Sequence, residues 1–232
     1  LGTMDLLKHH QAEAAIVTEP TDLALVLAHR GLFWYEVETV GKAVHGSRYT
    51  EGIDAIMRMG RFLSHLEVLE KDLRGRAGHP LTGPPSLHAA LIAGGTDSCT
   101  YADSCRLQID RRSIPGERAQ QVTSELQEII DQLEADDPTF QAALRLAVQR
   151  PALETDRDSK ISRAVQRAAQ HVLEQEVVQT GAAYWSDAAL LAEAGMEAVL
   201  FGTVGAGLHG PEEWVDLGSV VQLAAVLVET AG

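Results

Sequence analysis

Gly31-Leu32-Phe33-Trp34-Tyr35-Glu36-Val37-Glu38-Thr39-Val40 alternates side chains of two kinds along its length. One side of the alternation carries Phe33, Tyr35, Val37 and Thr39, and the other carries Trp34, Glu36 and Glu38. A period of two residues is typical of a β-strand with one buried face. The stretch therefore predicts a strand that belongs to a sheet covered on one side.

Further elements follow this strand in a regular order. Residues 52–72 show the spacing of an amphipathic helix, with apolar positions at Ile53, Ile56, Met57, Leu63, Leu66 and Leu69. Glycines and prolines make residues 75–85 a loop. Strands are then expected at 86–93 and 103–112, a helix at 115–135 and a strand at 140–148, with Phe140, Ala142, Leu144, Leu146 and Val148 on one side. The order β-α-β-β-α-β predicts a ferredoxin-like sandwich.

The segments on either side have a different, α/β character. An apolar strand is expected at 14–17, helices near 157–172, 187–194 and 217–230, and a short buried strand at 199–201. We therefore expect residues 1–29 and 149–232 to form one domain, into which residues 30–148 are inserted.

Composition excludes several classes of function. The chain has 232 residues, with 19 basic and 33 acidic side chains and a net charge of −14, which opposes binding to nucleic acid or anionic lipid. No apolar run is long enough to span a membrane, and the first residues do not resemble a signal peptide. The sequence predicts a cytoplasmic protein whose two cysteines, Cys99 and Cys105, are free thiols.

The beginning of the chain is unusual. The first methionine is Met4, and Leu1-Gly2-Thr3 reads as the continuation of a helix that starts upstream. We therefore expect the sequence to be truncated at its N-terminus.

A glycine-rich loop near the C-terminus carries the strongest chemical signal. Gly202-Thr203-Val204-Gly205-Ala206-Gly207-Leu208-His209-Gly210-Pro211-Glu212-Glu213-Trp214 places one histidine beside two carboxylates. Glycines allow close approach of the backbone to an ion, and carboxylates orient a neutral imidazole ligand. The loop is consistent with a metal ligand, and also with a surface histidine that has no such role.

Four other stretches accompany this loop in a fixed order. They are Glu19-Pro20-Thr21, Gly41-Lys42-Ala43-Val44-His45-Gly46-Ser47, Arg112-Ser113-Ile114-Pro115-Gly116-Glu117 and Tyr184-Trp185-Ser186-Asp187. Together with the His209 loop they resemble the dinuclear-zinc amidohydrolase family of acetylornithine deacetylase, succinyl-diaminopimelate desuccinylase, carboxypeptidase G and aminoacylase. The resemblance covers nearly the whole chain.

The resemblance implies a fold and an activity. The fold is part of a zinc-exopeptidase-like catalytic domain with an inserted ferredoxin-like lid that mediates homodimerisation. The activity is hydrolysis of the amide bond of an N-acyl amino acid or small peptide, with acetylornithine-like molecules favoured. Two divalent metal ions, zinc or alternatively cobalt, polarise the carbonyl and activate a shared water in such enzymes.

The resemblance also assigns roles to individual residues. Glu19 is implied as a carboxylate ligand to one metal and His209 as an imidazole ligand to the other, with Glu213 steadying His209. The alternative for Glu19 is an ordinary surface or helix-capping acid. His45 is implied to donate a hydrogen bond to the oxyanion across the dimer interface, although a histidine with a purely local role in a turn remains open.

Arg112 is implied to clamp a substrate carboxylate with its planar guanidinium. Strand parity places it opposite Cys105, Leu107 and Ile109, on the open face of the sheet, whereas Arg111 points toward the helices. A solvated strand charge is the alternative for Arg112.

Ser186 and Asp187 are candidates for substrate contact, for capping of the helix that follows, or for both. Gly205 and Gly207 are expected to turn backbone N–H groups toward the substrate.

Some parts of the family pattern are missing from this sequence. Three further ligands, including a bridging aspartate, and the glutamate that acts as general base are expected to precede Leu1. One protein ligand per metal does not hold zinc tightly, so we expect the 232-residue chain to be inactive and its flanking segments to be unstable or sticky. Thr203 and Ala102 stand where relatives carry proline.

Two other functions remain open. The chain would act as a noncatalytic dimerisation or regulatory module if the edge of the sandwich pairs with a second copy. It would alternatively be an unrelated ferredoxin-like ligand-binding domain.

Overall fold

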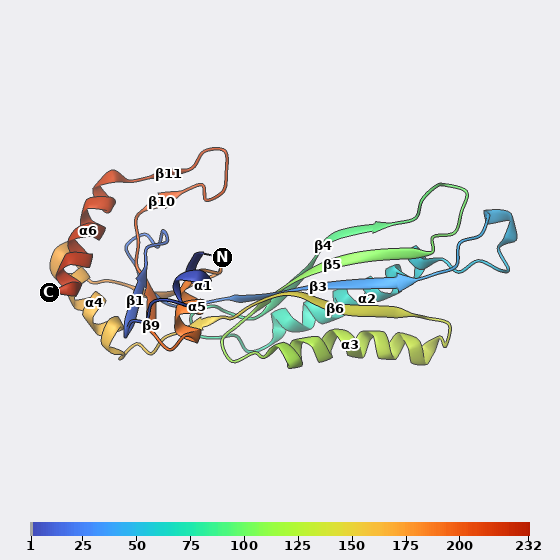
Figure 1. The fold of residues 1–232 in the computed structure, drawn as a ribbon, viewed down its shortest axis with the longest axis horizontal. Coiled ribbons are helices and arrows are strands. Elements are labelled where there is room, and N and C mark those ends of the chain that lie inside the picture. The colour runs from blue at the N-terminus through green and yellow to red at the C-terminus, as the bar shows by residue number, and fades with distance from the viewer. Residues whose placement is uncertain (1) are drawn as a thin grey trace. The chain divides into compact units, whose positions relative to one another are not determined.

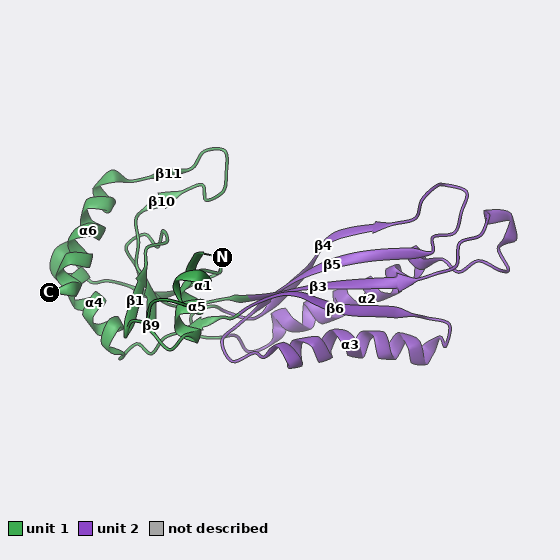
Figure 2. Ribbon diagram, viewed as in Figure 1, with its two compact units in different colours: residues 1–31, 79–82, 151–232 green, residues 32–78, 83–150 purple. Residues whose placement is uncertain are grey.

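The computed structural model describes residues 2–232 and shows a mixed α/β fold with two compact units (Figures 1 and 2). Unit 1 contains the described residues up to Gly31, together with His79–Thr82 and Pro151–Gly232. Unit 2 contains Leu32–Gly78 and Gly83–Arg150. The sequence places residues 79–82 within the inserted segment, but the structure packs them with unit 1.

Unit 2 has the predicted β-α-β-β-α-β order. Its elements are β3 (Gly31–Val40), α2 (Ala55–Gly75), β4 (Ser86–Gly94), β5 (Ser104–Ser113), α3 (Ala119–Asp136) and β6 (Ala142–Arg150), with a short 3-10 helix at Gly46–Arg48. The sheet order is β4-β5-β3-β6, so the first and third strands of the motif lie at the centre. The predicted ferredoxin-like sandwich is confirmed.

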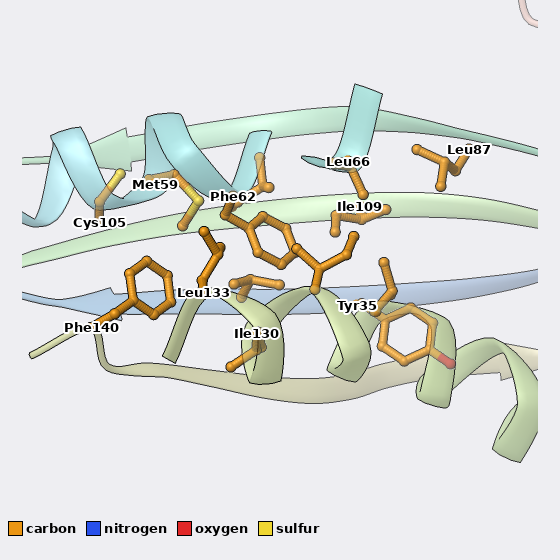
Figure 3. Packing of buried hydrophobic residues seen from close by; sticks show 14 of the residues in the cluster. Tyr35, Met59, Phe62, Leu66, Leu87, Cys105, Ile109, Ile130, Leu133 and Phe140 are labelled. Atoms are coloured by element: carbon orange, nitrogen blue, oxygen red, sulfur yellow. The ribbon is translucent and has the colours of Figure 1, made fainter. Parts of the chain in front are cut away.

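The core of unit 2 lies between this sheet and its two helices, as Figure 3 shows. Strand residues on the covered face meet α2 and α3, and include Tyr35, Cys105, Leu107 and Ile109. The opposite side of the sheet, which carries Trp34, Glu36, Arg106 and Gln108, is called the open face below.

The buried face of α2 differs from the prediction. Asp54 caps the helix by accepting from the N–H groups of Ile56 and Met57 at 2.9 and 3.1 Å, so the helix begins at Ala55. Met57 is 69% exposed. The residues that the helix buries are Ala55, Arg58, Met59, Phe62, Leu66 and Leu73.

A bulge in the sheet of unit 2 places Val148 on the face opposite to the one that the sequence predicts. The pairing of β3 with β6 shifts between Trp34 and Tyr35, where the partners change from Val148 to Leu146. The extra residue reverses the alternation of β6 at this point. Val148 therefore lines a cavity on the open face, although the sequence pattern places it on the core side.

Unit 1 contains a sheet built from short strands, with β1 (Ala14–Val17), β9 (Glu197–Leu200), β2 (Leu25–His29) and β7 (Leu153–Glu154) in that order, and β8 (Gln179–Ala182) beside β2. Leu25 and Leu27 pack toward α4 (Lys160–Leu173) and α6 (Leu217–Ala231). Val26, between them, packs toward α5 (Ala188–Glu193). This alternation along one strand places helices on both faces of the sheet.

Several elements of unit 1 were not predicted. β7, β8 and the hairpin of β10 (Gly205–Ala206) and β11 (Trp214–Val215) are two to four residues long, which is too short for a clear periodic pattern. The expected N-terminal helix is present as α1 (Gly2–Leu6), while Leu1 lies outside the described residues.

Cys99 and Cys105 are free, as expected. Within residues 2–232, none of the helices combines the length and the apolar character that a membrane span requires.

Candidate functional site

Two parallel strands of unit 1 bring the Glu19 loop and the glycine-rich loop together. β1 and β9 pair in parallel, with Val17 opposite Leu200, so the residues that follow them emerge at the same edge of the sheet. Gly202 packs so closely that a Cβ at this position would lie 1.9 Å from the carbonyl oxygen of Glu19. Only glycine fits this contact, which fixes the two loops against each other.

Hydrogen bonds reinforce this junction. The N–H of Gly202 donates to Thr21 Oγ1 at 2.9 Å, and the N–H groups of Asp22 and Leu23 donate to Thr203 and Gly202 at 3.1 and 3.0 Å. Asp22 and Leu23 have φ angles of 54° and 58°, in the left-handed region that costs an ordinary residue about 1–2 kcal/mol. Strain of this kind is maintained only where neighbouring contacts enforce it, and it occurs frequently at functional sites.

Tyr184 covers the same junction. Its hydroxyl donates to the carbonyl oxygen of Pro20 at 2.9 Å. Burial, followed by the negative charges of Glu19 and Asp22, raises the pKa of Tyr184 to about 12. The tyrosine therefore stays neutral beside two carboxylates. Tyr184 belongs to one of the motifs quoted from the sequence, but neither it nor Asp22 was expected to have a role at the site.

His209 lies at the end of the hairpin that β10 and β11 form, which Figure 1 shows projecting beyond the sheet of unit 1. Gly207 has a φ of 81°, and a Cβ there would lie 2.0 Å from the carbonyl oxygen of Glu212. His209 itself has a φ of 58° and is exposed. A tight turn thus presents the imidazole to solvent.

The other residues predicted for this loop have local partners or none. The N–H of Gly205 donates to Asp22 Oδ1 at 3.3 Å, so it is directed to a carboxylate within unit 1. Glu213 is exposed, and the described contacts include no hydrogen bond between it and His209.

The metal pair implied by the resemblance does not fit the residues of this chain alone. Within residues 2–232 there is no group of three or more His, Cys, Asp or Glu side chains placed to hold a metal ion. A catalytic zinc site ordinarily uses three protein ligands. Glu19 and His209 would supply only one carboxylate and one imidazole to such a pair of ions.

Ser186 and Asp187 immediately precede α5, and both side chains have hydrogen-bond partners within unit 1. Ser186 is buried, and its Oγ accepts from the N–H of Ala188 at 3.3 Å. Asp187 Oδ2 accepts from Thr3 Oγ1 at 2.5 Å, and among the described residues its side chain caps no helix N–H. Ser186 thus accepts from the first N–H of α5, while Asp187, at the N-cap position, ties α1 to α5.

His29 is a buried histidine that the sequence left without a role. It is 0% exposed, and its ring lies 6.5 Å from that of Trp185. Nδ1 donates to the carbonyl oxygen of Arg30 at 3.0 Å, which leaves Nε2 as an acceptor without a partner within the described chain. Burial lowers the pKa of His29, so the ring is held neutral.

His45 is in unit 2, at the start of the short 3-10 helix. Its Nδ1 accepts from the N–H of Ser47 at 3.2 Å, and the ring is exposed. Because an N–H group can only donate, Nδ1 carries no proton and the neutral ring carries it on Nε2. The loop thus presents an outward N–H donor.

Arg111 and Arg112 point to opposite faces of β5, as predicted. Arg111 is 1% exposed and forms a bidentate ion pair with Glu117 at 2.5 and 3.3 Å. Arg112 is partly exposed on the open face and donates to Asp110 Oδ2 from Nε and Nη2 at 3.1 and 2.8 Å. Asp110 was not singled out from the sequence.

Comparison with known proteins identifies the family of one segment of this chain. Residues 27–138 match the family model of the peptidase dimerisation domain, M20_dimer. This segment is an M20 dimerisation domain. Over 94% of its length, the chain is 33% identical to acetylornithine deacetylase of Myxococcus xanthus, and it covers 56% of that protein. The chain thus spans about half the length of the curated relatives it matches, and the resemblance to the acetylornithine deacetylase family is confirmed.

Solved structures show the same fold. The aminopeptidase PepT of Bacillus cereus superposes with a TM-score of 0.79 at 15% identity, with 100% of this chain and 61% of that one covered. The M20 family metallo-carboxypeptidase Sso-CP2 of Sulfolobus solfataricus gives 0.74 at 16% identity, with 97% and 64% covered. These neighbours confirm the predicted α/β fold with an inserted dimerisation domain.

Proposed function

We propose that this M20-type chain is part of a metal-dependent hydrolase that cleaves the amide bond of an N-acyl amino acid or small peptide. The observation that carries the proposal is the junction of the Glu19 and Gly202 loops at one edge of the unit 1 sheet. The similarity to an acetylornithine deacetylase over 94% of the chain supports the same reaction class and makes N-acetylornithine the first substrate to test.

In this proposal residues 1–29 and 149–232 belong to the catalytic domain, and residues 30–148 form the lid. Glu19 is a carboxylate ligand to one divalent metal, and His209 is an imidazole ligand to the other, with Glu213 beside it. Zinc, or alternatively cobalt, polarises a carbonyl and lowers the pKa of bound water when such a centre is complete. The remaining ligands and the general base are supplied from outside this chain.

Further residues of the chain bind and orient the substrate in this proposal. Arg112 pairs with the substrate carboxylate, to which its partly exposed guanidinium donates while Asp110 holds the guanidinium in place. His45 donates from Nε2 to the oxyanion, acting from the neighbouring subunit of a homodimer. The remaining contacts with the substrate are proposed to come from Ser186, Asp187, Gly205 and Gly207.

The test is hydrolysis of Nα-acetyl-L-ornithine by the complete polypeptide encoded by the reading frame that contains this chain. Release of the free α-amine is expected, with a loss of about 10²–10³-fold in kcat for His45→Ala, because one oxyanion donor is removed. His65→Ala is the matched control, since this exposed histidine lies on α2. Hydrolysis at equal rates by the His45 variant and the wild type contradicts the role of His45, and absence of any amidase activity contradicts the function.

We propose that the 232-residue chain alone is inactive as a hydrolase. A second candidate function is that of a dimerisation module, which the family match of residues 27–138 favours. β4 is an edge strand, on which Leu91 and Ile92 are 64% and 55% exposed. Light scattering with zinc titration separates the two functions. A stable dimer that binds no zinc and cleaves no N-acetyl amino acid, even in the complete polypeptide, supports the module.

A further inference from the structure

A cavity of about 440 Å³ lies beside α4 in unit 1. Three arginines, two glutamines and one aspartate line it: Arg157, Arg163, Arg167, Gln166, Gln179 and Asp158. Two of the arginines lie on α4, Arg157 lies in the loop before α4, and Gln179 begins β8. Three positive charges thus face one negative charge, in a chain whose net charge is −14.

The three arginines of this cavity have no carboxylate partner among residues 2–232. Arg157 donates to Gln179 Oε1 at 2.9 Å, which orients its guanidinium without neutralising it. The side chains of Arg163 and Arg167 form no hydrogen bond or ion pair within the described chain. Exposure alone does not explain this, because the Arg106 side chain is 72% exposed and still pairs with a glutamate of β3 at 3.2 Å. The cavity therefore presents three cations that an anion can bind.

Helix geometry brings two of these charges together. Arg163 and Arg167 are four residues apart on α4, a spacing that places side chains next to each other on the helix surface. Like charges at this spacing repel each other, and a bound anion would relieve the repulsion. Val165, Ala168 and Ala169 are buried in the core of unit 1, so α4 cannot rotate to move the arginines apart from the cavity.

The number of guanidinium groups favours a phosphate over a carboxylate. A phosphate ester carries about 1.5–2 negative charges at neutral pH and three oxygens that accept strongly, whereas a carboxylate has one charge and two oxygens. Guanidinium groups donate to phosphate oxygens in pairs of parallel hydrogen bonds. A phosphate therefore has enough charge and enough acceptors for all three arginines.

A second cavity, of about 550 Å³, adjoins the first within unit 1. The two cavities share Arg157 and Gln179 in their linings. Glu154 and Asp156 also line the second cavity, and their carboxylates repel any further anionic group. A volume of this size holds the body of a small molecule, which is expected to be uncharged.

Both carboxylates of the second cavity keep an oxygen that can accept from a ligand. His79 Nδ1 accepts from the N–H of Leu81, so Nε2 donates to Glu154 Oε1 at 3.1 Å. Asp156 Oδ1 accepts from the N–H of Asp158 at 2.8 Å. Because the second oxygen of each carboxylate has no donor among the described residues, hydroxyl groups of a ligand are suitable partners.

We propose that unit 1 binds a phosphate monoester of an uncharged, polyhydroxylated small molecule at these two cavities. The phosphate accepts hydrogen bonds from Arg157, Arg163 and Arg167, and hydroxyl groups of the body donate to Glu154 and Asp156. The residues that line the two cavities belong to neither the Glu19 loop nor the His209 loop. The site is thus independent of the proposed hydrolysis.

Calorimetry with the 232-residue chain, in a phosphate-free buffer of low ionic strength, tests this site. Ribose 5-phosphate is compared with ribose, inorganic phosphate and inorganic pyrophosphate. The ester is expected to bind at least about tenfold more tightly than ribose or inorganic phosphate, because only the ester occupies both cavities. Pyrophosphate is expected to bind more weakly than the ester, since its second phosphate faces Glu154 and Asp156.

Arg163→Gln and Arg167→Gln each remove one guanidinium, and each is expected to weaken binding of ribose 5-phosphate at least about tenfold. Glutamine has nearly the helix propensity of arginine, so α4 stays folded, which circular dichroism checks. Arg118→Gln is the matched control and is expected to leave the affinity unchanged. Arg118 is also exposed and has no ion pair within the described residues, but it lies in unit 2.

Unchanged affinity in the folded Arg163→Gln and Arg167→Gln proteins overturns the phosphate site. An equal loss in Arg118→Gln also overturns it, because the chain would then respond only to its overall charge. Pyrophosphate that binds more tightly than ribose 5-phosphate refutes the proposed class of ligand. These results do not depend on amidase activity, so a failure here leaves the proposed function intact.

Discussion

Gly202 shows how a single residue positions the candidate site. Replacing it with alanine forces a Cβ to within 1.9 Å of the backbone of Glu19, and backbone cannot move aside as a flexible side chain can. We predict that Gly202→Ala lowers the free energy of unfolding by about 1–3 kcal/mol and reduces amidase activity of the complete polypeptide. Urea denaturation and the hydrolysis assay measure these effects.

Gly60→Ala serves as the control for that substitution. Gly60 is exposed within α2, and a Cβ there meets nothing within 4 Å. Alanine is expected to increase stability by about 0.4–1 kcal/mol at this position. A Gly202→Ala protein as stable and active as the wild type would contradict the close packing of the two loops.

His29 makes stability depend on pH. Because burial lowers the pKa of the folded imidazole below 6.5, the unfolded chain takes up a proton first as the pH falls. Above pH 6.5 both states are neutral and His29 has no effect. Below it, stability is lost until the folded pKa is reached, at a rate of up to about 1.4 kcal/mol per pH unit.

We predict that His29→Asn, which preserves a donor toward Arg30, flattens the dependence of unfolding free energy on pH below 6.5. Denaturant titrations between about pH 5 and 7.5 measure this slope for the wild type, for His29→Asn and for the exposed control His65→Asn. Parallel curves for the wild type and His29→Asn would show that His29 is protonated as easily in the folded chain as in the unfolded one.

At the scale of elements, a buried ion pair fastens β5 to the loop before α3. Arg111 is 1% exposed, and its charge is matched by Glu117, with Glu125 farther away at 3.7 Å. Removing the nearer carboxylate leaves a buried charge poorly compensated, so Glu117→Gln is expected to cost about 3–5 kcal/mol of unfolding free energy.

The matched control for Glu117→Gln is Glu67→Gln on α2. Glu67 pairs with Lys71 at 2.7 Å, and both side chains are about two-thirds exposed. No measurable loss of stability is expected there, because an exposed ion pair contributes little. Similar costs for the two variants, measured by urea denaturation, would mean that Arg111 is solvated rather than buried.

The elements of unit 2 could be predicted because apolar side chains repeat along each of them with the period of a strand or a helix. The alternation from residue 31 to residue 40 and the parity of Arg111 and Arg112 come directly from strand geometry. Val148 could not be placed, since the bulge at Trp34 is a property of the pairing with β6 and has no signal in either strand alone.

At the candidate site, the sequence identified the Glu19 and His209 loops but not the contacts between them. Asp22 and Tyr184 meet these loops only through tertiary packing, for which neither residue has a local sequence signal. The roles of the nine predicted site residues remain predictions.

At the scale of the whole molecule, each of the two units has hydrophobic packing of its own. One core, around Phe62 and Leu126, holds the dimerisation unit together, and the clusters around Leu25 and Val26 hold unit 1. We therefore propose that unit 1 carries the metal ligands and that unit 2 recognises the substrate.

The most direct test of this account is the metal content of the complete polypeptide, measured by mass spectrometry after gel filtration. The wild type is predicted to carry about two divalent ions per chain, and Glu19→Ala and His209→Ala are each predicted to lower this to about one. The exposed His171→Ala control should match the wild type. Metal content that is unchanged in both the Glu19 and His209 variants would contradict the central claim that these two residues are ligands.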